Sequence, residues 1–445
     1  MLELSLIDNT GASEAQTITI PTTGFSNIVV SSWYPNYGTF DPTHVTQVNL
    51  EARGNVWGNS LGVTTMLNLD VAYMTVGLAA ATWVRNDLGA WTTATNWNTN
   101  LIPNGVDAVA TFGNMLTSNH TVSIDGDTTL GTLTFYDAAA SYYVSGAGSL
   151  ILQTAAGTGG TINVISGNHA LTPDKIEIAS STLLTVTSGS LTLGGTKAGL
   201  VIDAGKTLSI AHGSTVNILG VIHNQGTLSV LASDGLAQAS VLAVGGMDGS
   251  GTLDLTNNKL ILHDADVSGV EAQLGGGAIT SSLAAASGGT TALGVLSGAA
   301  HLALCGNNAT FGGQRVLAGD ILAGYTSAGD TTLKGYIDAT DFAQIDAAWL
   351  RIQNGALNAG FHWANGDFNH DGRVDATDFA LIDAAYALQG GHLAAEILDQ
   401  VRFAGTAFES VYQAALSSAL SGAVPESASL GLLALGALGL LRRRR

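Results

Sequence analysis

The sequence of 445 residues is poor in cysteine, in basic residues and in charge of either sign. Its single cysteine, Cys305, excludes an internal disulfide framework and a cysteine-based zinc site, and we expect it to be a small hydrophobic residue in a buried strand. Lys and Arg number 15 against 34 Asp and Glu, giving a formal net charge of −19. Nucleic acid is therefore excluded as a partner, because its phosphates require clustered basic side chains.

Glycine, by contrast, is abundant at 57 residues, and the chain is long enough for several domains. Residues 1–78 alternate apolar and polar side chains between turns, which predicts half-buried strands and a β-sandwich-like segment. No basic residue precedes Arg53 and no signal peptide follows Met1, so we expect either a misassigned start or an N-terminally truncated precursor, and favour truncation. Four aromatic residues here belong either to the sandwich core and rim or to a sugar-stacking platform: Trp33, Tyr34, Tyr37 and Trp57.

From Gly131 onward, a loose phrase recurs in which glycine precedes two alternating aliphatic residues. Each unit is too short to bury its own apolar face, which predicts a right-handed parallel β-helix or solenoid over residues 82–320. Trp83, Trp91 and Trp97 are predicted to plug its first coil, with sugar stacking as the alternative. The aliphatic pairs expected to point inward include Leu191/Leu193, Leu208/Ile210 and Leu253/Leu255.

The most specific signal is an acidic stretch at residues 366–378, which reads GDFNHDGRVDATD. Ca²⁺ takes about six to eight oxygen ligands, and a glycine at loop position six allows the sharp turn round the ion. Gly372 stands at that position, and Arg373 at position seven offers its backbone carbonyl. Oxygen-bearing side chains stand at positions one, three, five, nine and twelve: Asp367, Asn369, Asp371, Asp375 and Asp378. The spacing predicts a Ca²⁺ site, with an acidic surface turn before a helix as the alternative.

A second copy of the phrase lies upstream, at residues 329–341. Position five is Lys334, whose ammonium is repelled by Ca²⁺, so we expect this copy to bind the ion weakly or not at all. The remaining loop positions of this degenerate site are Asp330, Thr332, Tyr336, Asp338 and Asp341.

Both loops precede a segment with helical apolar spacing, and the residues predicted to form a core between the two helices are Phe342, Ile345, Trp349, Phe379, Ile382 and Tyr386. Two loop–helix units in tandem resemble the dockerin type I module, over residues 322–389. This resemblance implies that Ca²⁺ orders the fold and that the module docks onto a cohesin-like or intramolecular partner.

The C-terminal region is predicted to contain linker helices at 392–420 and a hydrophobic, transmembrane helix within 424–445. The face of the linker helices is expected to carry Leu393, Ile397, Val401, Phe408, Val411 and Leu416. The last segment resembles a PEP-CTERM sorting signal, which implies engagement of the membrane and of an exosortase-type enzyme. Its motif residues are Pro425, Glu426, Arg442, Arg443, Arg444 and Arg445.

From residue 82 onward, the order of these features resembles a planctomycete surface-protein family with autotransporter-type β-strand repeats. We therefore expect an exported, non-catalytic, adhesin-like protein at the cell surface or outside the cell, anchored at its C-terminus. The alternative is a polysaccharide-degrading enzyme or a carbohydrate-binding component, which would need clustered carboxylates for catalysis. His212 and His223 are eleven residues apart and could stack on neighbouring coils, but each is more simply a turn residue. No hydrolase or phosphate-loop motif occurs.

Overall fold

The computed structural model describes residues 2–8, 13–18, 34–37, 45–52, 80–155, 158–195, 197–234, 240–389, 403, 405–406 and 408–422. Two compact units, Met1–Gly77 and Leu78–Arg445, are described separately below. Trp33, Trp57 and the predicted sorting segment at 424–445 lie outside the described residues. No helix among the described residues is long and apolar enough to cross a membrane.

The first unit contains one antiparallel sheet with the strand order β3-β2-β1-β4. Its strands are β1 (Leu2–Asp8), β2 (Ser13–Ile18), β3 (Tyr34–Tyr37) and β4 (Val45–Ala52). All four described strands belong to this sheet, so the pairing of two sheets in a sandwich stays a prediction. Tyr34 and Tyr37 are the two ends of β3.

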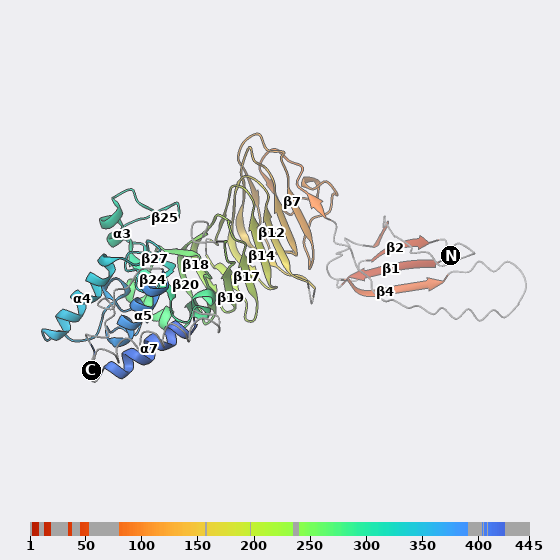
Figure 1. Ribbon diagram of the computed structural model, residues 1–445. Coiled ribbons are helices and arrows are strands. Elements are labelled where there is room, and N and C mark those ends of the chain that lie inside the picture. Colours follow the sequence, from red (N-terminus) through yellow and green to blue (C-terminus); the bar gives the residue numbers. More distant parts are fainter. Residues whose placement is uncertain are drawn as a thin grey trace, which may run out of the picture. The chain divides into compact units, whose positions relative to one another are not determined.

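The second unit is built round a β-solenoid over residues 109–280, in which the chain passes alternately between two parallel sheets (Figure 1). The first sheet contains β5 (Ala81–Thr82), β7 (Val109–Phe112), β10 (Thr132–Phe135), β12 (Gly160–Val164), β14 (Thr182–Val186), β17 (Thr207–Ile210), β19 (Thr227–Val230), β21 (Thr252–Asp254) and β23 (Ile279–Thr280). The parallel strands of the second sheet are β6 (Gly89–Ala90), β8 (His120–Ser123), β9 (Thr128–Leu130), β11 (Tyr142–Leu152), β13 (Asn168–Ile178), β15 (Ser190–Leu193), β16 (Gly199–Ile202), β18 (Val216–Asn224), β20 (Val241–Asp248) and β22 (Lys259–Leu262). The predicted solenoid is confirmed, whereas its right-handedness stays a prediction.

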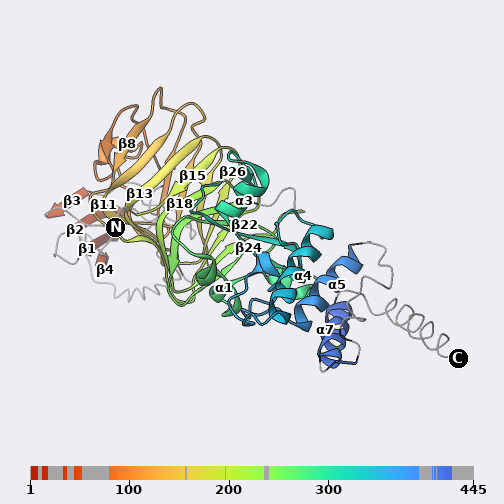
Figure 2. The same ribbon diagram turned by 90° about the vertical axis from the view of Figure 1, so that its left-hand side faces the viewer.

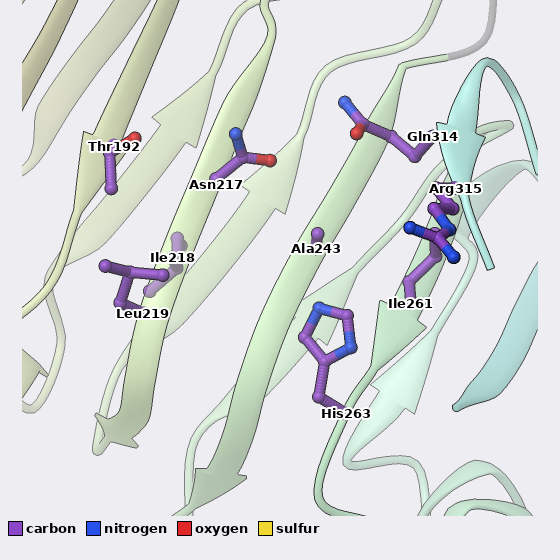
Figure 3. A pocket seen from close by; sticks show the side chains of 9 residues that line it. All are labelled: Thr192, Asn217, Ile218, Leu219, Ala243, Ile261, His263, Gln314 and Arg315. Atoms are coloured by element: carbon purple, nitrogen blue, oxygen red, sulfur yellow. The ribbon is translucent and has the colours of Figure 1, made fainter. Parts of the chain in front are cut away.

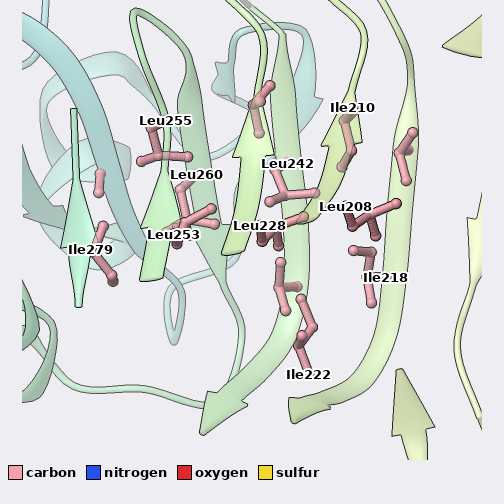
Figure 4. Close-up of a cluster of buried hydrophobic side chains, with 14 of the residues drawn as sticks. Leu208, Ile210, Ile218, Ile222, Leu228, Leu242, Leu253, Leu255, Leu260 and Ile279 are labelled. Atoms are coloured by element: carbon pink, nitrogen blue, oxygen red, sulfur yellow. The ribbon is translucent and has the colours of Figure 1, made fainter. Parts of the chain in front are cut away.

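Aliphatic side chains at matching positions of successive strands fill the space between the two sheets (Figure 4). In the first sheet, the strand register places four buried residues in one row: Leu208, Leu228, Leu253 and Ile279. Each such side chain contributes about 1.5–3 kcal/mol of stability when fully buried. A single coil cannot bury these side chains, so the stability comes from stacking coils on one another. All six aliphatic residues predicted to point inward are buried.

The first coil is closed by three tryptophans, as predicted. Trp83, Trp91 and Trp97 expose no more than 1% of their surface and surround Phe112, with ring centroids 4.8–5.9 Å apart. The indole of Trp91 donates to the carbonyl of Pro103 at 3.0 Å, which satisfies its buried N–H. The short 3₁₀ turn η2 (Ala94–Asn96) lies beside them. Sugar stacking is the wrong interpretation for these three residues, because none presents a free ring face.

Two antiparallel strands lie at the other end of the solenoid. Strand β22 pairs with β27 (Ile321–Ser327), which pairs with β24 (Thr291–Ser297), so the parallel stacking stops there. The intervening elements are α1 (Val267–Gly275), α2 (Ser282–Ala286), α3 (Gly298–Cys305), β25 (Thr310–Phe311) and β26 (Gln314–Arg315). Cys305 is the last residue of α3 and is exposed, so its predicted place in a buried strand is wrong.

Beyond β27 the described elements are helical, namely α4 (Ala339–Gln353), the 3₁₀ turn η4 (Trp363–Asn365), α5 (Ala376–Leu388) and α7 (Glu409–Gly422) (Figures 1 and 2). The predicted core between α4 and α5 is confirmed: Ile345, Phe379 and Ile382 are buried, and the rings of Phe342 and Tyr386 meet edge to face at 5.6 Å.

Helix α7 packs on α5, where the hydroxyl of Tyr412 donates to Asp383 Oδ2 at 2.5 Å. Its buried side chains include Tyr412 and Leu416. Phe408 and Val411, which we predict on the buried face together with Leu416, are instead 45% and 46% exposed. The expected helical period does not hold across this segment, because α7 begins only at Glu409. Leu393, Ile397 and Val401 lie outside the described residues.

Candidate metal centre

Two loops with the same hydrogen-bond pattern lead into α4 and α5. The first loop, residues 330–341, follows β27, and the second loop, residues 367–378, follows η4. The aspartate at position nine of each loop is the N-cap of the following helix, and the aspartate at position twelve completes a capping box with it. The helix starts therefore fix Asp338, Asp341, Asp375 and Asp378 in place.

Backbone amides hold the position-one and position-twelve carboxylates in the same way in both loops. Position one accepts from the glycine amide at position six, and position twelve accepts from the amides at positions two and nine. In the first loop these bonds are Asp330–Gly335 at 2.6 Å, Asp341–Thr331 at 2.9 Å and Asp341–Asp338 at 2.8 Å. In the second loop they are Asp367–Gly372 at 2.8 Å, Asp378–Phe368 at 2.8 Å and Asp378–Asp375 at 2.9 Å.

The glycine that precedes each loop packs on the helix that follows the other. A Cβ at Gly329 would lie 2.5 Å from Ile382 in α5, and one at Gly366 would lie 2.7 Å from Ile345 in α4. Both glycines have positive φ, of 118° and 105°. The entry to each loop therefore packs closely against the helix of the other repeat.

In the second loop, the buried carboxylates of Asp367 and Asp378 lie close to other acidic side chains. Asp367 is 1% exposed and Asp378 is fully buried. Burial, with smaller contributions from the charges of Asp371 and Glu271, raises the pKa of Asp367 to about 7, although hydrogen bonds from the amides of Gly372 and Asp371 oppose the shift. Burial likewise raises the pKa of Asp378 well above its ordinary value. A cation at this point would remove the cost of keeping both groups ionised.

The other predicted donors of the second loop are arranged round its turn. Asn369 Oδ1 accepts from the amide of Asp371 at 2.9 Å, and Asp371 Oδ1 accepts from the amide of Arg373 at the same distance. Asp375 Oδ1 caps the helix through the amide of Thr377 at 2.8 Å. Among the residues that the structure describes, no three His, Cys, Asp or Glu side chains are gathered closely enough to hold a metal ion. The carboxylates of the second loop are held by amides instead.

The first loop already contains a cation. The ammonium of Lys334 hydrogen-bonds to Asp341 and lies 3.2 Å from Thr332 Oγ1 and 3.5 Å from Asp330 Oδ1. It also lies 3.7 Å from Asp338 Oδ1. Burial by itself lowers the pKa of Lys334, but the hydrogen bond to Asp341 and the nearby carboxylates outweigh it, so that the pKa lies above its ordinary value.

The two loops therefore differ in how well they fit Ca²⁺. The second loop offers only oxygen donors, the ligands that this hard cation takes. None of the ion pairs between described residues neutralises Asp367 or Asp378. The first loop does not fit, because an ammonium stands among its oxygens. Tyr336, predicted to offer its carbonyl there, places its ring 5.1 Å from the Lys334 ammonium.

The loop region is tied to the end of the solenoid by contacts that sequence reasoning missed. Glu271 of α1 accepts from the backbone amide of Trp363 at 2.8 Å and contacts His362 Nδ1 at 2.5 Å. His370, at position four of the second loop, donates from Nε2 to the carbonyl of Leu293 in β24 at 2.8 Å. These partners lie 77–92 residues apart in the sequence, so no local pattern could reveal them.

The solenoid also carries a groove on its second sheet (Figure 3). Residues in register on successive strands line it, namely Thr192, Asn217, Ala243 and Ile261, with Gln314 and Arg315 beside them. None of the described residues that line this groove is a carboxylic acid. His263, at its edge, pairs with Asp320 at 2.8 Å.

The two histidines considered as a pair lie on different elements. His212 is exposed in the turn after β17. His223 lies within β18 rather than in a turn, where it pairs with Asp248 at 2.7 Å. The strand register places His223 beside Val201 and Asp248, so the two histidines do not stack on neighbouring coils.

Residues 328–385 match the family of the Dockerin type I domain. The chain thus carries a dockerin type I domain on a β-solenoid, in agreement with the resemblance of its tandem loops. Domains of this family bind Ca²⁺ and typically bind cohesin partners. No curated protein and no solved structure matches the chain.

Proposed function

We propose that this chain is an exported, surface-displayed, non-catalytic β-solenoid scaffold, adhesin-like in kind, whose dockerin domain binds Ca²⁺ and closes the C-terminal end of the solenoid. One observation carries the proposal: only Ala328 and Gly329 separate β27, a strand of the solenoid sheet, from Asp330 of the first loop. A module on a flexible linker moves independently of its neighbour. This one follows directly on a strand of the solenoid sheet, which favours an intramolecular role over a free docking module.

The residues that would hold Ca²⁺ are the side chains of the second loop together with the backbone carbonyl of Arg373. The side chains are those of Asp367, Asn369, Asp371, Asp375 and Asp378. The bound ion would neutralise the buried carboxylates and so stabilise the folded domain. Binding of this kind adds directly to the free energy of unfolding, because the unfolded loop has no preformed site.

The absence of carboxylates among the described residues that line the groove supports a non-catalytic solenoid. Hydrolysis of a glycosidic bond needs a pair of acids at a fixed separation. The side chains of Thr192, Asn217 and Gln314 can instead donate and accept hydrogen bonds, as sugar hydroxyls require. They favour a second candidate function, a carbohydrate-binding component, which binding of neutral polysaccharides to the full chain would test.

The surface location rests on the dockerin domain and on the predicted sorting segment. Engagement of the membrane and of an exosortase-type enzyme by Pro425, Glu426 and Arg442–Arg445 stays a prediction from the sequence. A cohesin-like partner also stays a prediction, as an alternative to the intramolecular contact through Glu271.

The calcium assignment is tested by calorimetric titration of the full chain and of Asp371→Ala. Removal of one charged ligand should lower the Ca²⁺ affinity by at least about tenfold, since the number of charged ligands tunes affinity in such loops. Asp264→Ala, which removes an exposed carboxylate from the solenoid, is the matched control and should leave binding unchanged. Equal affinity in the wild type and Asp371→Ala would refute the assignment.

A further inference from the structure

The two loops of the dockerin domain bury the same pair of aspartates but differ in the charge of the side chain at position five. Positions one and twelve are buried aspartates in both loops: Asp330 and Asp341 in the first, and Asp367 and Asp378 in the second. Their hydrogen bonds to backbone amides correspond one to one. At position five, the second loop has Asp371, whereas the first has Lys334.

The ammonium of Lys334 lies among the oxygens that the loop pattern reserves for an ion. Its four contacts come from loop positions one, three, nine and twelve, which are Asp330, Thr332, Asp338 and Asp341. These positions correspond to Asp367, Asn369, Asp375 and Asp378 of the second loop. The side chain of Lys334 is 21% exposed, so it is held within the loop and not in solvent.

We propose that Lys334 is a built-in cation that takes the place of Ca²⁺ in the first loop. A tethered ammonium supplies positive charge to Asp330 and Asp341 whether or not calcium is present. The first loop is therefore permanently ordered, and the dockerin domain responds to a single ion, at the second loop. This inference rests on the proposed function for the second loop alone, since the role of Lys334 needs no calcium.

The first test measures the thermal stability of the full chain in EDTA, in which the second loop is without metal. Lys334→Met keeps the length and apolar stem of the side chain but leaves two buried carboxylates unpaired. Removing one partner of a buried pair is strongly destabilising, so Tm should fall by about 5 °C or more.

Lys197→Met is the matched control, because it removes an ammonium that pairs with Asp174 but is 73% exposed. Its Tm should change little, since exposed ion pairs contribute little to stability. A Lys334→Met chain as stable in EDTA as the Lys197→Met chain would overturn the proposal.

The second test counts calcium ions by titration calorimetry of the same full chain. The wild type should bind one ion, and Lys334→Asp, which supplies the missing position-five carboxylate, should bind two. Asp371→Ala should bind its ion at least about tenfold more weakly, and the double variant Lys334→Asp/Asp371→Ala should keep one ion bound with high affinity at the first loop.

The proposal is overturned by two ions in the wild type, or by a Lys334→Asp chain that binds no more ions than the wild type. No ion in the wild type, together with a destabilised Lys334→Met chain in EDTA, would instead refute the second-loop assignment and leave the role of Lys334 standing. The failures of the two proposals are thus distinguishable.

Discussion

At the residue scale, His169 shows how the solenoid fixes one protonation state of a buried side chain. Its Nδ1 accepts from the backbone amide of Tyr142 at 3.2 Å, so Nε2 carries the proton and donates to the carbonyl of Ser166 at 3.0 Å. The ring stacks on Phe135 with centroids 4.9 Å apart. Burial lowers the pKa of His169, although the hydrogen bond to Ser166 and the charge of Asp137 oppose the shift.

A pH dependence follows from this lowered pKa. The folded state favours neutral His169, so its stabilising contribution is complete above the unfolded pKa of about 6.5 and is lost as the pH falls through the lower folded value. His169→Gln can accept and donate in the same places without titrating. The Tm of the wild type should therefore fall relative to that of the variant between pH 7.5 and pH 5, as measured by calorimetry. A constant difference between the two chains would contradict this account.

The residue types of the candidate site could be predicted from the sequence, but their contacts could not. Loop spacing alone singled out Asp367 and Asp378, and the charge of Lys334 alone argued against calcium in the first loop. That the same ammonium lies beside both Asp330 and Asp341 depends on how the loop folds round it. Spacing gives the positions of charges along the chain and not the direction of a long flexible side chain.

At the scale of the element, the two repeats of the dockerin domain depend on glycines where each loop meets the other repeat's helix. Gly366 and Gly372 both have positive φ, of 105° and 80°. A Cβ at Gly366 would lie 2.7 Å from Ile345, whereas one at Gly372 would have no atom within 4 Å. The two positions therefore share backbone strain but differ in packing.

Alanine at each position separates these two effects. Gly372→Ala should cost about 1–2 kcal/mol of unfolding free energy from the left-handed backbone alone. Gly366→Ala should cost about 1–3 kcal/mol more, because α4 must move away from the loop. Denaturant unfolding of the two full-length variants measures the difference, and equal losses would show that the contact between the repeats is not tight.

The coils of the solenoid could be predicted from the sequence, whereas the buried face of α7 could not. Alternating aliphatic residues after each glycine reveal the coils because every coil repeats the same inward positions. The repeat is loose because turns vary: register partners are 29 residues apart from Thr132 to Thr161 but 20 apart from Leu208 to Leu228. The buried face of α7 was misassigned, since Phe408 precedes the helix and the side chains that pack on α5 follow a different spacing.

At the scale of the Leu78–Arg445 unit, the solenoid and the dockerin domain share structure. Strand β27 pairs with β22 and β24 and then leads directly into the first loop. His370 of the second loop reaches the carbonyl of Leu293 in β24, and its ring stacks on Trp363 with centroids 5.4 Å apart. When calcium orders the second loop, it should therefore also stabilise β24 and β27 at the end of the solenoid. Such coupling could not be predicted from the sequence, because it depends on contacts between distant segments.

Hydrogen exchange of the full chain in Ca²⁺ and in EDTA tests this central claim most directly. Exchange rates report local opening, and a ligand slows exchange wherever its binding stabilises the closed state. We predict that Ca²⁺ slows exchange in the second loop and also in β24 and β27, and that Asp371→Ala removes both effects. Slowing confined to residues 360–389, or no slowing at all, would contradict a calcium-ordered domain that closes the end of the solenoid.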